Sequence, residues 1–297
     1  MSVFDLTLYE NLPWQFTSLF IMLGAAIGSF FNVLSQRWPA YQVGKNDSEA
    51  LYWLRLRGMQ AGSGKTSSAD SVSLMSGRSK CPCCKTPIPL YLNIPLVSWL
   101  VLRGRSACCG KPINFRYLAY EIFGALVFTA IALTTGPTVA GLLLGILLML
   151  LSLAAVIDLS DSFIPESLLF IGFFLSYGLS MSPIGIGIES AFIAHLSTFF
   201  GLYFVFGTLG KIMGKDLVGT GDFHLLALCA SILGSISWML PILILPFSLI
   251  TWMLFKAKVF QRGIFSDVIG AGSIPAGPAI VLSTFCLVAL KITGVYP

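Results

Sequence analysis

Two aspartates at the ends of apolar segments are the residues of this chain best suited to chemistry. Asp158 ends the run Val156-Ile157-Asp158, and Asp222 ends the run Gly219-Thr220-Gly221-Asp222. An ionised carboxylate at the centre of a membrane helix costs roughly 2.5–3.5 kcal/mol on insertion scales, so such residues are functional-site hypotheses by default. When two carboxylates lie close together, one tends to keep a proton while the other stays ionised. The two motifs therefore predict a carboxylate pair for acid–base catalysis.

Each acidic motif alone also has a plain structural explanation. Gly-x-Gly-Asp is a common turn before a helix, where an aspartate caps the first backbone N–H groups. Asp158 alone fits a helix end near lipid headgroups. We interpret the nearby Asp161 and Glu166 as solvated loop charges. The catalytic interpretation thus depends on whether the fold brings Asp158 and Asp222 together.

Five of the seven cysteines lie in one short stretch, which is the second place with chemical potential. Cys81 and Cys84 form a Cys-x-x-Cys pair with Cys83 between them, and Cys108-Cys109 follows. Thiolates at this spacing can hold tetrahedral zinc, and a reducing compartment disfavours disulfides. We predict a structural zinc held by Cys81, Cys84 and Cys109, with Cys108 or Cys83 as the fourth ligand. Free thiols or a metal-free turn are the alternatives.

The composition determines which elements must position these residues. The chain is 56% hydrophobic and only 10% charged, whereas soluble proteins contain about 25% charged residues. We therefore predict an all-α polytopic membrane protein whose helices approach the ~20 residues that a bilayer requires. About eight transmembrane segments are expected, at 16–36, 118–135, 139–157, 164–181, 187–210, 223–239, 241–255 and 276–295.

Basic residues predict the orientation of these segments. Twelve of the 18 Lys and Arg residues fall between Arg37 and Arg116, and none precedes Arg37. The positive-inside rule then puts the N-terminus outside and the loop 37–117 in the cytoplasm. With this topology Asp158 and Asp222 both lie at the cytoplasmic face. The bases are scattered rather than clustered, so we expect contact with membrane lipid and not with nucleic acid.

These observations divide the chain into three expected parts. Residues 1–36 contain the external N-terminus and the first transmembrane helix, and residues 37–117 form a basic cytoplasmic loop domain with the thiol site. Residues 118–297 form the transmembrane part with both aspartates. Within the loop, we expect the polar stretch 40–79 to be mobile and the short apolar stretch Pro89–Leu102 to be interfacial rather than spanning.

Several further motifs occur in one order along nearly the whole chain. They are Gly28-Ser29-Phe30-Phe31-Asn32-Val33, Asn93–Trp99, Arg116-Tyr117 with Glu121, Ile157-Asp158, Gly219–Asp222 and Gly277-Pro278. In this order the motifs resemble those of the bacterial type IV prepilin peptidases, which are inner-membrane aspartic proteases. Members of that family remove the basic leader of type IV prepilins and of type II secretion pseudopilins. Many also methylate the new N-terminus with S-adenosylmethionine.

The resemblance implies specific roles for residues of this chain. Asp158 and Asp222 match the catalytic pair of the family, which makes 118–297 the expected peptidase domain. Ser106 replaces the first cysteine of the second Cys-x-x-Cys of the family, and Cys109 matches its other cysteine, so the zinc site departs from the pattern. The sequence has no Gly-rich fingerprint in the loop, and the residues that would bind S-adenosylmethionine are therefore unknown at this point.

Two different functions compete with this interpretation. A transporter could use paired aspartates to relay protons or bind cations, but such sites usually lie near the bilayer midplane between two related halves of the chain. A catalytically inactive relative could serve as an assembly scaffold, although the intact aspartate motifs disfavour it. Both aspartates are expected at one membrane face, which favours the peptidase.

Overall fold

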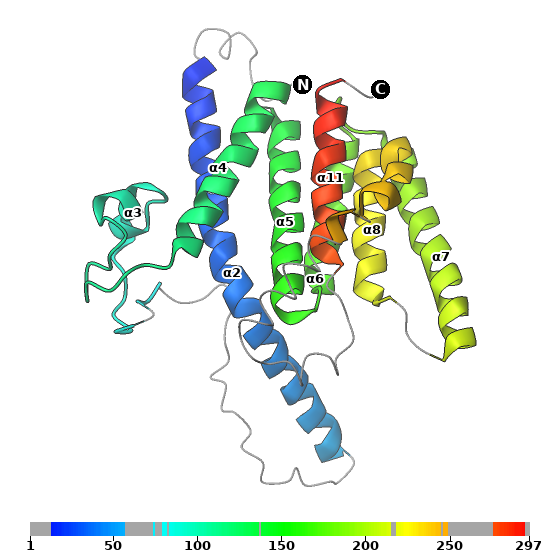
Figure 1. The fold of residues 1–297 in the computed structure, drawn as a ribbon, viewed down its shortest axis with the longest axis horizontal. Coiled ribbons are helices and arrows are strands. Elements are labelled where there is room, and N and C mark those ends of the chain that lie inside the picture. The colour runs from blue at the N-terminus through cyan, green and yellow to red at the C-terminus, as the bar shows by residue number, and fades with distance from the viewer. Residues whose placement is uncertain are drawn as a thin grey trace. The chain divides into compact units, whose positions relative to one another are not determined.

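The computed structural model describes residues 13–56, 74, 79–81, 83–136, 138–214, 218–244, 246–248 and 276–294. The chain forms two compact units, one made of residues 22–125 and one of residues 1–21 with 126–297. Within the described ranges every secondary-structure element is a helix (Figure 1). The β-structure there is limited to two isolated bridges, Lys80–Pro87 and Arg105–Pro112. The predicted all-α fold is confirmed.

Among the described residues, four helices are long and apolar enough to cross a membrane. They are α2 (Pro13–Leu56), through its segment Trp14–Lys45, α4 (Phe115–Thr135), α5 (Val139–Asp161) and α7 (Ile188–Met213). Three shorter apolar helices follow the same pattern: α6 (Glu166–Ser180), α8 (Thr220–Leu233) and α11 (Gly277–Ile292). These seven helices match seven of the predicted segments. The remaining one, 241–255, lies mostly outside the described residues, so the count of eight stays a prediction.

Helix α2 is longer than the sequence analysis expected. It continues through Pro39 to Leu56, so the expectation that residue 40 begins a mobile loop is wrong for 40–56. A proline inside a helix removes one backbone hydrogen bond. Good helix formers follow it, among them Glu49, Ala50 and Leu51. A polar segment that is too hydrophilic to span a bilayer can therefore still form a helix. The rest of 40–79, except residues 74 and 79, lies outside the described ranges.

In the unit 22–125, α2 and α4 approach each other closely because glycines line their contact. A Cβ atom on Gly28 would collide with the Tyr120 carbonyl, and one on Gly124 would collide with the Gly24 carbonyl. Gly24 and Gly28 form a Gly-x-x-x-Gly pair, the pattern that lets membrane helices pack backbone to backbone. The same two helices share a hydrogen bond from Arg116 to the Ser35 hydroxyl, 3.0 Å long. Small residues and polar contacts therefore hold this helix pair together.

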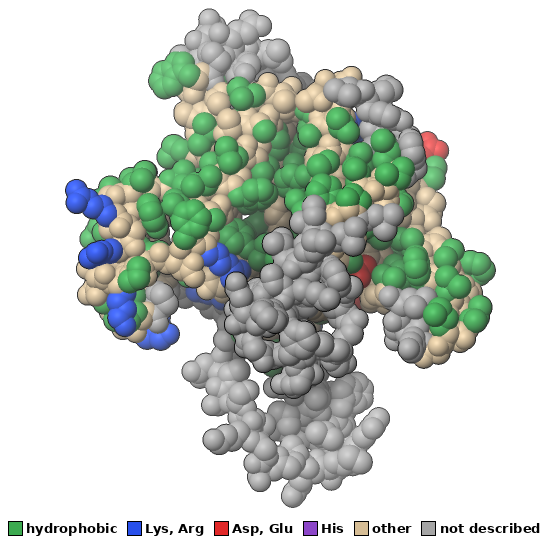
Figure 2. Space-filling view, in the orientation of Figure 1, with side chains coloured by type: hydrophobic (Ala, Val, Ile, Leu, Met, Phe, Trp, Pro, Cys, Tyr) green, Lys and Arg blue, Asp and Glu red, His purple; other side chains and the backbone are tan. Residues whose placement is uncertain are grey.

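Between these two helices, the described residues form two short helices, η1 (Leu90–Asn93) and α3 (Val97–Val101). Neither is long enough to span a bilayer, as the sequence analysis expected for Pro89–Leu102. Lys and Arg side chains gather over α3 and its flanking turns, whereas apolar side chains cover much of the other visible helices (Figure 2). The exposed bases here include Lys80, Lys85, Arg103, Arg105 and Lys111.

In the other unit, α5 is the most deeply buried of the candidate membrane spans. Leu147, Leu151 and Leu153 are fully buried, and α5 packs against α6 and α11. Helix α8 packs against α6, α7 and α11, so α11 contacts both helices that carry a motif aspartate. Gly172 of α6 permits this packing, since a Cβ there would press against Leu228 of α8 and Leu150 of α5.

Candidate functional site

Asp158 lies in the last turn of α5 and is 5% exposed. Its Oδ2 atom accepts a hydrogen bond from the backbone N–H of Gly277, with a length of 2.8 Å. Gly277 is the first residue of α11, and the N-terminus of a helix carries a partial positive charge that stabilises a carboxylate. A Cβ atom on Gly277 would lie 2.7 Å from the same oxygen. Only glycine therefore allows the backbone to approach Asp158 this closely.

Asp222 is half-buried in the first turn of α8, directly after the glycine turn. Its backbone N–H donates to the Gly219 carbonyl over 3.1 Å. A Cβ on Gly221 would lie 3.2 Å from the Cβ of Ile164, a buried residue in the turn that follows α5. The second glycine of the motif thus lets the start of α8 approach the end of α5.

The two motif aspartates lie at the same end of this unit. The C-terminal end of α5 and the N-terminal ends of α8 and α11 all lie at the lower end of these helices in Figure 1. This arrangement is the one that a carboxylate pair requires, and the catalytic role of the pair remains a prediction. Sequence reasoning missed the Gly277 N–H as a partner of Asp158, although the Gly277-Pro278 motif pointed to this position.

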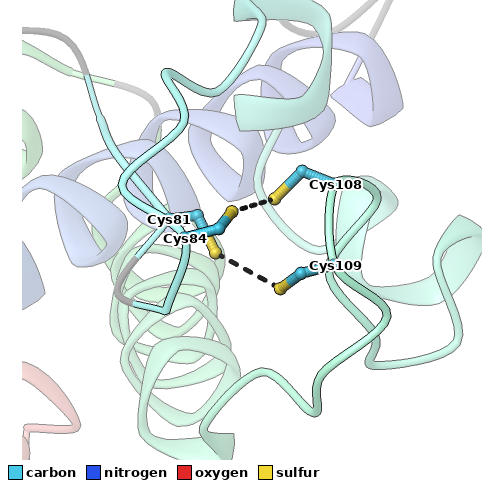
Figure 3. A group of neighbouring side chains, drawn as sticks. All are labelled: Cys81, Cys84, Cys108 and Cys109. Atoms are coloured by element: carbon cyan, nitrogen blue, oxygen red, sulfur yellow. Dashed lines mark hydrogen bonds between the residues drawn. The ribbon is translucent and has the colours of Figure 1, made fainter.

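Four of the five loop cysteines form one cluster. The sulfur atoms of Cys81, Cys84, Cys108 and Cys109 all lie within 4.8 Å of one another (Figure 3). The Cys81–Cys109 sulfur distance is 3.8 Å and the Cys84–Cys108 distance is 3.0 Å. Zn–S bonds of ~2.3 Å in a tetrahedron separate neighbouring sulfurs by about 3.8 Å. The sulfurs of Cys81 and Cys109 have this separation, and those of Cys84 and Cys108 would have to move apart by less than 1 Å. The cluster excludes the exposed Cys83, which the sequence analysis left as a possible fourth ligand.

Two turns with the same backbone pattern build this cluster. In the first turn, Cys81 N–H donates to the Thr86 carbonyl and Lys85 N–H to the Cys81 carbonyl. In the second, Ser106 N–H donates to the Lys111 carbonyl and Gly110 N–H to the Ser106 carbonyl. A β-bridge closes each turn, and Lys85 and Gly110 both have positive φ.

The match between the turns explains the substitution at position 106. Ser106 occupies the position of Cys81 in the second turn, and Cys108 occupies that of Cys83. The Ser106 hydroxyl lies 3.5 Å from the Cys81 sulfur and 3.1 Å from the Cys108 sulfur. Cys108 therefore supplies the sulfur that Ser106 lacks. The sequence analysis missed this repeat, although the pattern Cys-Cys-x-x-Pro-Ile at 83–88 recurs 25 residues later at 108–113.

The cluster favours a thiolate at Cys81. Hydrogen bonds from the Cys84 backbone and the Ser106 hydroxyl lower the pKa of the Cys81 thiol to about 5. The Thr86 hydroxyl and Cys108 lower the pKa of Cys84. For Cys108, the Ser106 hydroxyl lowers the pKa, but Cys84 and desolvation outweigh it and raise the value to about 11. A thiolate is the form of cysteine that binds metal.

Comparison with known proteins agrees with the motifs. Residues 22–135 match the bacterial peptidase A24 N-terminal domain, and residues 145–257 match the type IV leader peptidase family. No solved structure is significantly similar to the chain.

Curated relatives match across most of their length. A prepilin leader peptidase/N-methyltransferase of Aeromonas hydrophila is 35% identical over 82% of this chain and 82% of its own. The protein of the same name from Klebsiella pneumoniae is 32% identical over 75% of this chain and 87% of its own. That from Neisseria gonorrhoeae is 30% identical over 77% of each chain. The chain therefore belongs to the type IV leader peptidase family.

Proposed function

We propose that this protein is a membrane aspartic endopeptidase that removes the leader of type IV prepilins or pseudopilins and then methylates the new N-terminus. The family and the names of its relatives support both reactions. The observation that carries the peptidase is that the Asp158 and Asp222 motifs lie at one end of a helix bundle, where Gly221 packs against Ile164 in the turn after α5. The transporter alternative has no support among these relatives.

Hydrolysis by this pair needs one ionised and one protonated carboxylate. The ionised carboxylate takes a proton from a water molecule, whose oxygen attacks the scissile carbonyl carbon, and the protonated carboxylate donates to the carbonyl oxygen. The C–N bond then breaks, its nitrogen takes up a proton, and a free carboxyl group and a free amine result. The protonation of the two carboxylates is coupled, so the roles of acid and base are assigned to the pair and not to either aspartate alone.

We place the catalytic pair at the cytoplasmic face of the bacterial inner membrane. The twelve bases between Arg37 and Arg116 support this orientation. A prepilin whose basic leader stays in the cytoplasm while its apolar helix spans the bilayer would present its cleavage site at this depth.

We also propose that the four-thiol cluster holds one structural zinc ion. The cluster offers four cysteine sulfurs, the number and type that a closed structural zinc site uses. The segment 79–114 contains only short helices and isolated bridges among its described residues, and few of its side chains are buried. Ligand bonds would supply the folding free energy that a core supplies elsewhere.

Co-expression with a candidate prepilin tests the proposed function directly. The N-terminus of the recovered pilin should lack the leader, and S-adenosylmethionine should add the mass of one CH₂ group to it. A processed pilin without this mass gain would reduce the proposal to a peptidase. An unprocessed pilin with every candidate substrate would contradict it altogether.

A further inference from the structure

Glu121 of α4 is a carboxylate that the reactions above do not use. Its side chain is only 9% exposed and lies on a helix that is apolar enough to span a membrane. One carboxylate oxygen accepts a hydrogen bond from the Ser29 hydroxyl of α2, and the other accepts one from the backbone N–H of Leu96. Both bonds are 2.8 Å long. All three residues belong to the unit 22–125.

No cation neutralises this carboxylate within the part of the chain that the structure describes. The nearest base along α4 is Arg116, whose guanidinium donates to the Ser35 hydroxyl and lies 5.7 Å above the Tyr120 ring. Burying an unpaired charge costs several kcal/mol. An ionisable group kept at membrane depth at this cost is a functional-site hypothesis.

The backbone held by Glu121 is strained. Leu96 has φ 62° and ψ −48°, and the Val97 N–H donates to the Pro95 carbonyl over 2.6 Å. These values describe a γ-turn of the rare, strained kind. Such conformations are energetically unfavourable, persist only where the surroundings hold them, and cluster at ligand sites. Glu121 holds this one by accepting the Leu96 N–H.

Several buried polar atoms without a partner lie on the same three elements. Asn32 of α2 is fully buried, and its amide nitrogen has no hydrogen-bond partner. It lies three residues, just under one helical turn, after Ser29. Of the six buried side-chain polar atoms without a partner among the described residues, four lie on α2, α3 or α4: Asn32 Nδ2, Ser98 Oγ, Trp99 Nε1 and Tyr120 Oη. Folded proteins leave few such atoms unpaired, so each of them needs a ligand, a water or another explanation.

We infer that Glu121 supplies the negative charge of a cation-binding site in the unit 22–125. This site receives an ammonium or a sulfonium group during methyl transfer. This inference rests on the proposed N-methyltransferase function. Both reactants of that reaction are cations, namely the α-ammonium of the cleaved pilin and the sulfonium of S-adenosylmethionine. The Glu121 carboxylate, which no cation neutralises within the described residues, has the complementary charge. The buried amide of Asn32 adds a donor for an oxygen of the same ligand.

The transfer step has a simple balance of charge. The ammonium first loses one proton to water, and its nitrogen then bonds to the methyl carbon. The C–S bond breaks with its electron pair left on sulfur, which becomes a neutral thioether, while the methylated amine carries the positive charge. A fixed carboxylate next to the reacting atoms attracts the cation in both states.

The substitution Glu121→Gln tests the charge separately from the hydrogen bonds. A glutamine carbonyl oxygen can accept the Leu96 N–H, and its amide can donate to the Ser29 hydroxyl oxygen. We expect leader cleavage and metal content to stay at the wild-type level. The kcat/KM for methylation of a pilin supplied without its leader should fall by at least about tenfold, since the charge-assisted interaction between carboxylate and cation is lost.

Two control variants separate cation binding from bracing of the turn. Ser29→Ala removes one donor but leaves the carboxylate charge, so its methylation rate should fall much less than that of Glu121→Gln. Glu189→Gln removes an exposed carboxylate in the first turn of α7 and should change nothing. Wild-type methylation by Glu121→Gln, or equal losses in Glu121→Gln and Ser29→Ala, would overturn the cation site.

Binding measurements identify the cation. If Glu121 faces the sulfonium, the wild-type protein binds S-adenosylmethionine more tightly than S-adenosylhomocysteine, whose sulfur is neutral, and Glu121→Gln loses this preference. If Glu121 faces the ammonium, the preference is unchanged and the KM for the cleaved pilin rises.

The same measurements distinguish failure of this inference from failure of the proposed methyltransferase. A wild-type protein that never methylates a pilin would remove that part of the proposed function. The cation site would still be judged by direct binding of S-adenosylmethionine, S-adenosylhomocysteine and the cleaved pilin. Equal affinities of the wild-type protein and Glu121→Gln for all three ligands would exclude it.

Discussion

At the residue scale, the environment of Asp158 depends on a backbone group rather than on another side chain. The Gly277 N–H that reaches it is 119 residues away in the sequence. Asp222 depends in the same way on glycines, because Gly221 allows α8 to start beside Ile164. Close backbone contacts at the ends of helices thus position the two aspartates, rather than side-chain packing along a helix face.

The first prediction concerns the carboxylates themselves. Asp158→Asn and Asp222→Asn should each abolish detectable leader cleavage while the protein still accumulates in the membrane. Asparagine keeps the shape but cannot exchange a proton, and acid–base catalysis contributes roughly 10²–10⁴-fold to rates. Both variants should also fail to methylate full-length precursor, whose amine is still blocked. Purified enzyme with a synthetic precursor provides the assay.

Asp161→Asn is the matched control for these two variants. Asp161 ends the same helix, is exposed and accepts a hydrogen bond from the Ser160 hydroxyl. Its variant should cleave normally. Wild-type cleavage by either of the Asp158 or Asp222 variants would remove the proposed pair.

The second prediction concerns the glycine that faces Asp158. In Gly277→Ala the new methyl group would lie 2.7 Å from the Asp158 Oδ2 atom, so α11 or the carboxylate must move. Overpacking of this kind typically costs about 1–3 kcal/mol, and we expect a clear loss of cleavage with lower thermal stability. Gly201→Ala serves as control, since a Cβ there meets nothing within 4 Å. Equal activity of the two variants would argue against the role assigned to the Gly277 contact.

At the element scale, two short turns in the unit 22–125 act together, although neither has a core. Each is closed by one bridge and by matching backbone hydrogen bonds, and their cysteines meet in one cluster. Helices α2 and α4 pair through Gly28 and Gly124 and are joined by the Arg116–Ser35 bond. Glu121 ties the strained turn before α3 to this helix pair. The loop segment is therefore organised by a few specific contacts rather than by burial.

The third prediction follows from that organisation. Protein purified without chelator should contain one zinc ion per chain, and Cys81→Ser with Cys84→Ser should lose it. Because the ligand bonds supply folding free energy to this segment, the double variant should lose methylation before it loses cleavage. Elemental analysis and the mass of the processed pilin measure both effects.

Cys83→Ser tests which cysteines belong to the cluster. Cys83 is exposed and lies outside the group of four sulfurs, so this variant should keep its zinc. Absence of zinc from the wild-type protein would refute the metal site. Loss of zinc on changing Cys83 would instead show that the ligand set is wrong.

At the scale of the whole molecule, the asymmetry of basic residues predicts how the chain crosses the membrane. Helix α7 ends next to Lys211, on the same side as the start of α8 and Asp222. The described helices are compatible with alternate crossings that leave both motif aspartates at one face.

The fourth prediction tests this orientation. In a cysteine-free background, Ser2→Cys should react with a membrane-impermeant thiol reagent added to intact cells. Asp70→Cys should react only after the cells are opened, because positively charged loops stay in the cytoplasm. Labelling of Asp70→Cys from outside would invert the topology and place the aspartates at the wrong face for a prepilin leader.

The sequence alone determined the class of this protein, its helical fold and its family. Hydropathy, the bias of basic residues and the order of short motifs are local properties, and they identified Asp158, Asp222 and four cysteines as site residues. The length of α2 escaped the same reasoning, because a polar segment rich in helix formers can be read as loop or as helix.

Only the tertiary structure decided which residues act together. It selected Cys108 rather than Cys83 for the sulfur cluster, because two turns 25 residues apart share one backbone pattern. It paired Asp158 with the Gly277 N–H and Glu121 with Ser29 and Leu96. These contacts join residues 25 to 119 positions apart, and no local pattern specifies them, because they arise only when helices with suitable small residues pack against each other.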